Sequence, residues 1–551
     1  MKKILIPIGA LLLSGLTSAQ NQSSTTENYV YSKTYLDYNG TTATKTSETV
    51  QYFDGLGRPK QVVNIKASPQ GKDVVTPILY DGFGRQVRDY LPIPQQGTQN
   101  GAIYTQGSGL VDFPVGDPTG VYTNEKAFIH KNLENSPLDR ILSQVQPGTA
   151  WQGKSVQFGY DANTTADEVK KYVTVTTWVN GATSSQISQS TNYLAAQLYK
   201  NTVTDEDGNQ TIEFKNGEGQ VLLVRKMLSA TEKADTYYVY NEYNQLAFVI
   251  PPLASKTITL SPSDLENLCY QYRYDGRNRL VEKKLPGKGW EYMVYDKQDR
   301  LVLTRDTGLE GQGKWLFTKY DQFSRPIYTG ILDSPPGRAQ QVVAVEGVGS
   351  NNEIRTASSF NNTGMDVYYT TNSAYPQTNY VLLSVNYYDT YPSYSFNPAF
   401  PTMILGETTL TDTPTAEGLS TKSLPVMSLV KNIEDNNWTK NYTYYDKKGR
   451  TIGSYSINHL GGRTKVESRL DFAGVVQQSI TTHKRLDTET DKVITENFIY
   501  DQQNRLLSHT HQVDSNPVEY LAQNTYNELS QLSGKKVGGD ISFHSASGYQ
   551  L

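Results

Sequence analysis

Cysteine and histidine are scarce in this sequence, and neither sign of charge is in large excess. Among its 551 residues there are six histidines and a single cysteine, Cys269, which cannot form an intramolecular disulfide, so packing must stabilise the fold. The 51 Lys and Arg nearly balance the 55 Asp and Glu, for a net charge of −4, and no Lys/Arg-rich tract occurs. This balance argues against a nucleic-acid partner and a polybasic membrane patch.

Long hydrophobic runs are lacking after the first residues of the chain. Lys2 and Lys3 precede the apolar run 4–16, and the small residues 17–19 resemble a cleavage site, so the sequence predicts a signal peptide over 1–19. No later run approaches the roughly 20 apolar residues of a membrane span. We therefore expect an exported protein that is periplasmic, on the cell surface or secreted, with no transmembrane segment.

The usual signatures of catalytic and metal sites are also missing. Cys269 lies among alternating aromatic residues with no histidine nearby, which favours a buried position over a nucleophile. His509 and His511 would share one face of a strand and could hold a metal, but the sequence shows no further ligand close by. Neither a Gly-x-Ser-x-Gly element nor a phosphate-binding Gly-x-x-x-x-Gly-Lys loop is present.

The stretch that begins at Asp205 resembles the start of a calcium loop. The glycine required at its sixth position is missing, because Gly208 lies at position four, and Asn216 stands where a glutamate is needed. A hairpin turn over 207–209 is the better interpretation. The sequence thus predicts no catalytic, metal-binding or cofactor-binding residues, no cofactor and no enzymatic activity.

What the sequence does contain is a recurring six-residue motif. "YDGFGR", from Tyr80 to Arg85, has the skeleton Tyr/Phe-Asp-x-x-x-Arg, which occurs seven times, whereas a catalytic site normally appears once. The residues of this motif are Phe53, Asp54, Arg58, Tyr80, Asp81, Arg85, Tyr274, Asp275, Arg279, Tyr295, Asp296, Arg300, Tyr320, Asp321, Arg325, Tyr445, Asp446, Arg450, Tyr500, Asp501 and Arg505.

Degenerate copies fill the gaps between these seven. They begin at Phe214, Tyr240, Leu470 and Tyr526, so that successive copies start 21 to 34 residues apart within the stretches 214–320 and 445–526. A motif that recurs at this interval is the signature of a repeat architecture.

The residues between the motifs alternate between two faces. In "KWLFTKYD", Trp315 and Phe317 share a face opposite Leu316, as expected for a strand that ends at the motif. The motif then gains structural roles: the aspartate starts a turn, the Gly or Asn near position five accepts a positive φ, and the arginine can pair with the aspartate or stack on a tyrosine. We predict an all-β fold of stacked hairpins that form a coiled, shell-like or elongated sheet with loop-rich insertions.

The motif and its spacing resemble the YD-repeat (Rhs) family of exported bacterial proteins, most clearly over 214–330 and 440–532. The resemblance implies repeats that coil into a hollow β-shell able to enclose a C-terminal toxin. Residues 30–165 are similar to a module of unknown function that precedes such repeats in exported Gram-negative proteins. A core with an Asp-Pro-x-Gly element and a C-terminal effector, which complete members carry, are not found; Gly116–Gly120 resembles that element but lies at the other end of the chain.

The domain organisation that we predict has seven parts. These are a signal peptide (1–19), an N-terminal lead-in (20–50), a module of unknown function with two motifs (51–165), a repeat segment (166–330), a Ser/Thr/Asn/Pro-rich insertion with some strands (331–440), a second repeat segment (441–532) and a truncated or flexible tail (533–551). Short helices are expected near 124–135 and after Ser261, where a serine, a proline and early acids form a helix start.

The expected function is a non-enzymatic exported scaffold that forms part of a β-shell, whose partner would be a separate polypeptide with the missing core and effector. The alternative is a cell-surface adhesin or carbohydrate-binding protein that uses exposed tyrosines and the 331–440 insertion to bind a surface glycan. A third hypothesis is a hydrolase with paired carboxylates that meet only in the fold, although nothing in the sequence nominates a pair.

Overall fold

The computed structural model describes residues 24, 26–104, 120–122, 125–257 and 259–539, and the backbone of 549–550. The expected signal peptide (1–19) and nearly all of the Gly116–Gly120 element lie outside the described residues. The chain divides into two units: the first holds 1–129, 147–149 and 525–533, and the second holds the rest. No helix in the described part of the chain is long and apolar enough to cross a membrane.

The first unit contains an antiparallel sheet with the strand order β1-β2-β3-β4-β6. Its core is formed by side chains such as Val50, Tyr52 and Val63, which alternate along β2 and β3 as period-two strands require. The strands of this unit are β1 (Asn28–Tyr35), β2 (Thr46–Phe53), β3 (Pro59–Ile65), β4 (Val74–Pro77), β5 (Arg88–Tyr90) and β6 (Ile93–Pro94).

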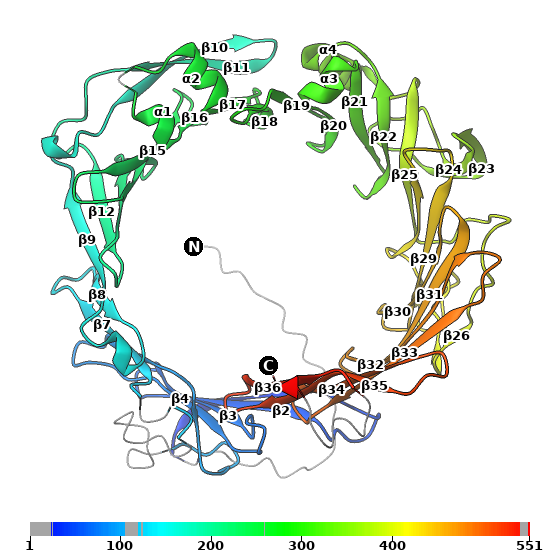
Figure 1. Ribbon diagram of the computed structural model, residues 1–551, viewed down its shortest axis with the longest axis horizontal. Coiled ribbons are helices and arrows are strands. Elements are labelled where there is room, and N and C mark those ends of the chain that lie inside the picture. The colour runs from blue at the N-terminus through cyan, green and yellow to red at the C-terminus, as the bar shows by residue number, and fades with distance from the viewer. Residues whose placement is uncertain are drawn as a thin grey trace. The chain divides into compact units, whose positions relative to one another are not determined.

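The second unit is dominated by one long antiparallel sheet in which neighbouring strands mostly follow each other in the chain (Figure 1). Its strands up to residue 320 are β7 (Phe128–Leu133), β8 (Ile141–Val145), β9 (Val156–Ala162), β12 (Tyr199–Thr204), β13 (Gln210–Lys215), β14 (Val221–Met227), β15 (Lys233–Tyr240), β16 (Leu246–Ile250), β17 (Tyr270–Tyr274), β18 (Leu280–Lys284), β19 (Trp290–Tyr295), β20 (Leu301–Arg305) and β21 (Lys314–Tyr320).

The same sheet continues from residue 326 to the end of the chain. These strands are β22 (Pro326–Asp333), β25 (Tyr380–Tyr388), β28 (Pro425–Lys431), β29 (Trp438–Tyr445), β30 (Thr451–Ile457), β31 (Gly461–Leu470), β32 (Val476–Leu486), β33 (Lys492–Tyr500), β34 (Leu506–Val513), β35 (Glu519–Tyr526), β36 (Leu532–Val537) and β37 (Tyr549–Gln550). The predicted all-β fold of stacked hairpins is therefore confirmed.

Smaller elements accompany the long sheet. Among the described residues, three two-stranded sheets are formed by β10 (Tyr172–Val179) with β11 (Ala182–Gln189), β23 (Arg355–Asn362) with β24 (Met365–Tyr369), and β26 (Met403–Ile404) with β27 (Glu407–Thr408). The helices are η1 (Thr149–Trp151), η2 (Thr165–Asp167), α1 (Pro252–Ser255), α2 (Pro262–Asn267), α3 (Thr307–Gly311) and α4 (Arg338–Gly347).

The predicted alternation along the strands holds in detail. In β21, Trp315 and Phe317 are buried, whereas Leu316 between them is 41% exposed. These two side chains belong to a large core that also includes Val345 of α4 and Val367 of β24. The segment between β22 and β25 thus supplies apolar side chains that cover one face of the long sheet.

Two of the expected short helices can be compared with the structure. The helix after Ser261 is confirmed: Ser261 accepts a hydrogen bond from the amide of Asp264, whose carboxylate accepts the amide of Ser261 in return. The helix expected near 124–135 is wrong, because β7 occupies this position and pairs with β8. The local sequence there is charge-rich and has no clear periodicity, so pairing with the neighbouring strand decides its secondary structure.

Two further boundaries differ from the expectation. Residues 331–440 are not one insertion, since β25 and β28 within them are strands of the long sheet. Residues 533–551, expected as a tail, contain most of β36.

Candidate functional site

The repeat turn is built around the aspartate of the motif. In the turn that joins β19 to β20, Asp296 Oδ1 accepts the amides of Gln298 and Arg300 at 2.9 and 3.0 Å, and Oδ2 accepts Arg300 Nε at 2.8 Å. The Asp296 amide donates to the Arg300 carbonyl at 3.0 Å. One carboxylate therefore satisfies two turn amides and pairs with the guanidinium that opens the next strand.

The structure places all seven predicted motif copies in the same turn. In each, the arginine Nε donates to the aspartate Oδ2 at 2.5 to 2.9 Å, and the fifth residue of the motif has a φ of +58° to +82°. Gly or Asn, which adopt a positive φ at little energetic cost, occupies this position in five copies. Asp299 and Ser324 adopt the positive φ in the other two. The strand register shifts by one residue just before the motif tyrosine in the β19–β20, β21–β22 and β33–β34 hairpins.

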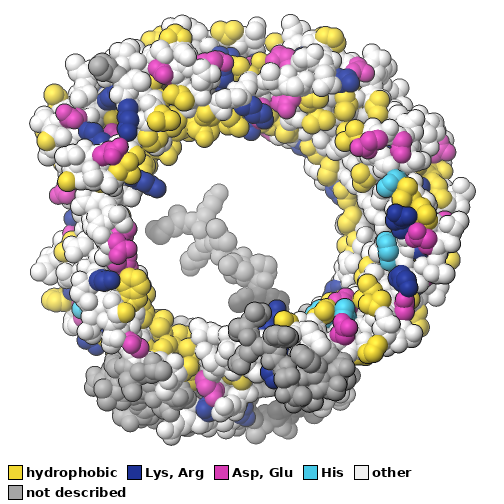
Figure 2. Space-filling view, in the orientation of Figure 1, with side chains coloured by type: hydrophobic (Ala, Val, Ile, Leu, Met, Phe, Trp, Pro, Cys, Tyr) yellow, Lys and Arg dark blue, Asp and Glu magenta, His cyan; other side chains and the backbone are white. Residues whose placement is uncertain are grey.

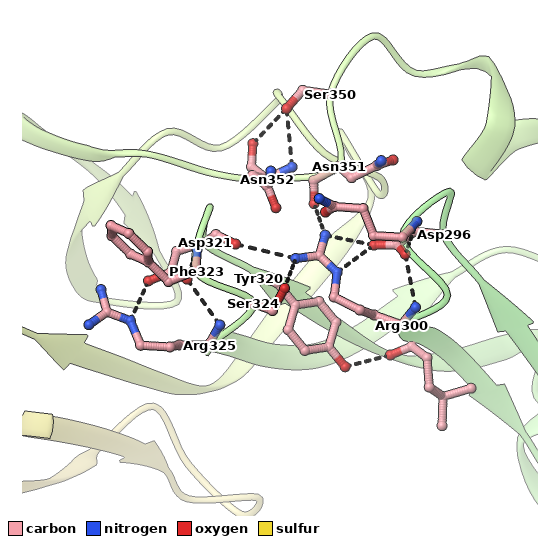
Figure 3. A network of polar contacts seen from close by, with 12 residues as sticks. Asp296, Arg300, Tyr320, Asp321, Phe323, Ser324, Arg325, Ser350, Asn351 and Asn352 are labelled. Atoms are coloured by element: carbon pink, nitrogen blue, oxygen red, sulfur yellow. Dashed lines mark hydrogen bonds and ion pairs between the residues drawn. The ribbon is translucent and has the colours of Figure 1, made fainter. Parts of the chain in front are cut away.

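In most copies, the tyrosine of the motif contacts the preceding hairpin instead of its own turn. Tyr320 donates its hydroxyl to the carbonyl of Leu301, the residue that follows Arg300, at 2.8 Å (Figure 3). The Arg300 guanidinium lies over the Tyr320 ring, 4.6 Å from its centroid, and also donates to the Asp321 carbonyl at 3.3 Å. Consecutive turns are thus clasped by a hydrogen bond and a cation–π contact.

The same clasp recurs along the chain. The tyrosine hydroxyls that donate to the carbonyl at the equivalent position of the preceding hairpin belong to Tyr80, Tyr274, Tyr295, Tyr320, Tyr388 and Tyr445. The arginines that lie over the tyrosine of the following turn are Arg58, Arg279, Arg300 and Arg325. Each hairpin is therefore fixed chiefly by its nearest neighbours, as in other repeat proteins.

One repeat is hidden in the sequence because its turn is expanded. Tyr388 pairs with Pro425 as motif tyrosines do, and the Asp389 amide donates to the carbonyl of Leu424, far along the chain. Arg325 of the preceding turn stacks on Tyr388 and forms two hydrogen bonds with the Asp389 carboxylate, at 3.0 and 2.8 Å. In the sequence, only the "YYD" at 387–389 indicates this repeat, because no arginine follows at the spacing of the motif.

Other turns keep the geometry with different side chains. The stretch that begins at Asp205 is a hairpin turn, in which Asn209 Nδ2 takes the place of the arginine and donates to Asp205 Oδ2 at 2.9 Å. Neutral versions pair Asn with Gln instead of Asp with Arg. They occur at Asn216 with Gln220, Asn241 with Gln245, and Asn527 with Gln531.

Burial of the motif carboxylate differs strongly between copies. The Asp296 side chain is 2% exposed and its partner Arg300 10%, whereas Asp81 and Arg85 are 20% and 19% exposed. Hydrogen bonds from the backbone amide and the guanidinium of Arg85 lower the pKa of Asp81, and Arg58 lowers the pKa of Asp54 in the same way.

These lowered pKa values predict a loss of stability in acid. A carboxyl group whose folded pKa lies below its unfolded value of about 3.9 stabilises the fold above that pH and loses this contribution as the pH falls below it. We expect hydrogen-exchange protection factors of the Asp54 and Asp81 turns to be constant between pH 7 and 5 and to fall below about pH 4. Asp54→Asn with Asp81→Asn should flatten this fall; an unchanged pH profile would contradict the assignment.

The candidate sites rejected from the sequence have structural roles. Cys269 is buried, which raises the pKa of its thiol to about 11 and makes it a poor nucleophile. His509 and His511 contact different carboxylates, Glu496 and Glu519. No group of three His, Cys, Asp or Glu that could hold a metal occurs in the described residues, and Figure 2 shows acidic and basic side chains interspersed over the visible face.

With this geometry established, the chain can be compared with known proteins. Residues 22–165 match the family "Domain of unknown function (DUF6443)". The match covers the first unit's sheet and β7 to β9. The comparison with curated proteins gives no match.

Several solved structures are similar to this chain at low identity. One is TcdB2-TccC3-TEV, with a TM-score of 0.41 and 10% identity; the match covers 96% of this chain and 24% of that chain. Another is TcdB2-TccC3 without its hypervariable C-terminal region, with a TM-score of 0.39 and 12% identity, over 92% of this chain and 22% of that chain. A Photorhabdus luminescens Tc holotoxin pore has a TM-score of 0.36 and 13% identity, over 92% of this chain and 24% of that one. The chain spans about a quarter of the length of these proteins.

Proposed function

We propose that this chain is a non-enzymatic, exported scaffold of the YD-repeat (Rhs) type, which forms part of a β-shell around a separate polypeptide. The observation that carries the proposal is the clasp between consecutive turns. It assigns the motif's tyrosine, aspartate and arginine to hydrogen bonds and ion pairs within the sheet, with Arg300 as the clearest case. Groups occupied in this way are poor candidates for acid–base or nucleophilic work.

The composition and the family match support the same proposal. A signal peptide over 1–19 would deliver the chain outside the cytoplasm, where a sheet without disulfides has to rely on packing and on such clasps. The match over 22–165 agrees with a leading module of unknown function before the repeats. The partner would be a polypeptide with the core and effector not found in this sequence.

The test is co-expression with the polypeptide encoded directly downstream. We expect the two chains to purify together and the partner to resist added protease in the complex while it is digested when alone. The control is this chain with Arg300→Ala and Asp296→Ala, which loosens one clasp and should reduce protection of the partner. Failure of the chains to associate, or digestion at equal rates, would sink the proposal.

A further inference from the structure

Between the turns that begin at Asn216 and Asn241 in the second unit, no clasp occurs among the described residues, and a cavity lies there. The turns that begin at Asn216 and Asn241 are both neutral, with Asn and Gln in place of Asp and Arg. Residues of both turns line a cavity of about 190 Å³. Unlike the six clasped tyrosines, Tyr240 donates its hydroxyl to no acceptor within the described residues.

At the turn that begins at Asn216, Gln220 makes no hydrogen bond to the next turn within the described residues, whereas Gln245 of the neighbouring neutral turn reaches Asn278 Oδ1 at 2.8 Å. In the charged turns, the guanidinium extends beyond its own aspartate to the next turn, as Arg279 does when it reaches Asp299 at 2.7 Å. Gln220 is shorter, and its Oε1 accepts Asn216 Nδ2 at 2.8 Å within its own turn. In the part of the chain that the structure describes, Gln220 Nε2 has no acceptor, so an amide donor is left at the cavity.

Tyrosines make up much of the remaining wall. Tyr172 and Tyr193, at either end of the segment that holds the β10–β11 hairpin, join Tyr238 and Tyr240 of β15 around the cavity. The Tyr172 hydroxyl is buried without a hydrogen-bond partner among the described residues. This hydroxyl is shielded from solvent and lies toward the core that holds Cys269, so the donors left at the cavity are Gln220 Nε2 and the Tyr240 hydroxyl.

The charges at the cavity favour a neutral ligand. Lys170 is the cation in its lining, and its ammonium group already donates to the carbonyls of Ser255 and Thr257 at 2.7 Å each. Glu218 is the acidic residue in the lining and is exposed. No unpaired buried charge therefore calls for a counter-ion.

We infer that this cavity binds a single neutral sugar ring. Asn and Gln amides offer both donors and acceptors, which match hydroxyl groups that are themselves both, and tyrosine rings offer apolar faces with a polar tip. The volume lies below the roughly 300–1,000 Å³ of sites for drug-sized ligands, which favours one ring over an oligosaccharide. The site differs in place from the 331–440 segment and does not depend on the scaffold function.

Titration of the purified full chain with glucose, galactose, mannose and N-acetylglucosamine, followed by calorimetry and saturation-transfer NMR, tests the inference. We expect at least one sugar to bind saturably, with a dissociation constant on the order of millimolar. Asn216→Asp with Gln220→Arg restores the charged turn and places a guanidinium in the cavity, so binding should weaken at least tenfold while the chain stays folded. The same pair of changes at Asn527 and Gln531, a neutral turn outside the second unit, should leave binding unchanged.

A second pair of variants separates binding from stability. Tyr240→Phe removes a hydroxyl without an acceptor in the described residues, so we expect an unchanged Tm and about fivefold weaker binding. Tyr295→Phe removes the hydroxyl that donates to Leu280, so we expect a lower Tm and unchanged binding. Absence of saturable binding for all four sugars, binding that survives the restored charged turn, or saturable binding of an uncharged tripeptide in place of the sugars would overturn the inference.

Discussion

Replacement of Lys319 by methionine is expected to destabilise the second unit by about 3–5 kcal/mol. Lys319 Nζ lies 2.7 Å from Glu353 Oε1, and both side chains are fully buried. Burial lowers the pKa of Lys319, while Glu353 favours its charged form. Without the lysine, the Glu353 carboxylate stays in the core with only neutral donors, which include the amide of Ala374 at 3.0 Å.

Urea unfolding followed by circular dichroism, together with hydrogen exchange of β21, measures this loss. The control is the double variant Lys319→Met with Glu353→Gln, which removes both charges and should recover most of the stability, because a buried pair contributes little net energy once its desolvation is counted. A loss below about 1 kcal/mol in the single variant, or no recovery in the double variant, would contradict the role of the pair.

Replacement of Asp296 by alanine is expected to cost about 3 kcal/mol, because it removes the acceptor of two turn amides and leaves the nearly buried Arg300 without its carboxylate. The matched variant is Asp81→Ala, which deletes the same hydrogen bonds in a more exposed copy and should have a clearly smaller effect. Both copies keep the tyrosine, aspartate and arginine of the motif and the same turn hydrogen bonds, while they differ in burial and in the three residues between aspartate and arginine.

Hydrogen exchange with peptide resolution is the measurement for this pair. In Asp296→Ala, we expect protection to fall in β19 and β20 and in the next hairpin, to which Arg300 is clasped through Tyr320 and Asp321. Protection of β31 to β34 should change little, since contacts in a repeat array are mainly between neighbours. Equal effects of the two substitutions would show that burial does not set the strength of these turns.

The parts of the fold that could be predicted are those that depend on near neighbours in the sequence. The Asp–Arg pair of a turn spans four residues and carries its own hydrogen-bond pattern, so the motif at Asp296 was readable without a structure. Strand alternation, as in Trp315 and Phe317, is local as well. The clasp between Tyr320 and Leu301 joins two hairpins and depends on their register, which no local pattern specifies.

The errors have a similar physical origin. The sequence does not reveal the hairpin of β25 and β28, because the partner of Asp389 in the turn is Leu424, beyond the reach of a fixed spacing. β7 was expected to be helical because its strand character comes from pairing with β8 instead of from its own residues. No local pattern marks the cavity beside Tyr240, because in the sequence its neutral turns look only like degenerate copies of the motif.

The expanded turn after Asp389 shows that the repeat array tolerates inserted segments. Arg325 contacts Tyr388 and Asp389 as other motif arginines contact the next turn, although α4 and the β23–β24 sheet lie between them in the chain. The entropy of closing a loop rises only with the logarithm of its length, by about 0.6 kcal/mol for each doubling. New segments can therefore enter between or within hairpins at small thermodynamic cost, which leaves such loops free to diversify while the sheet that carries them is inherited unchanged.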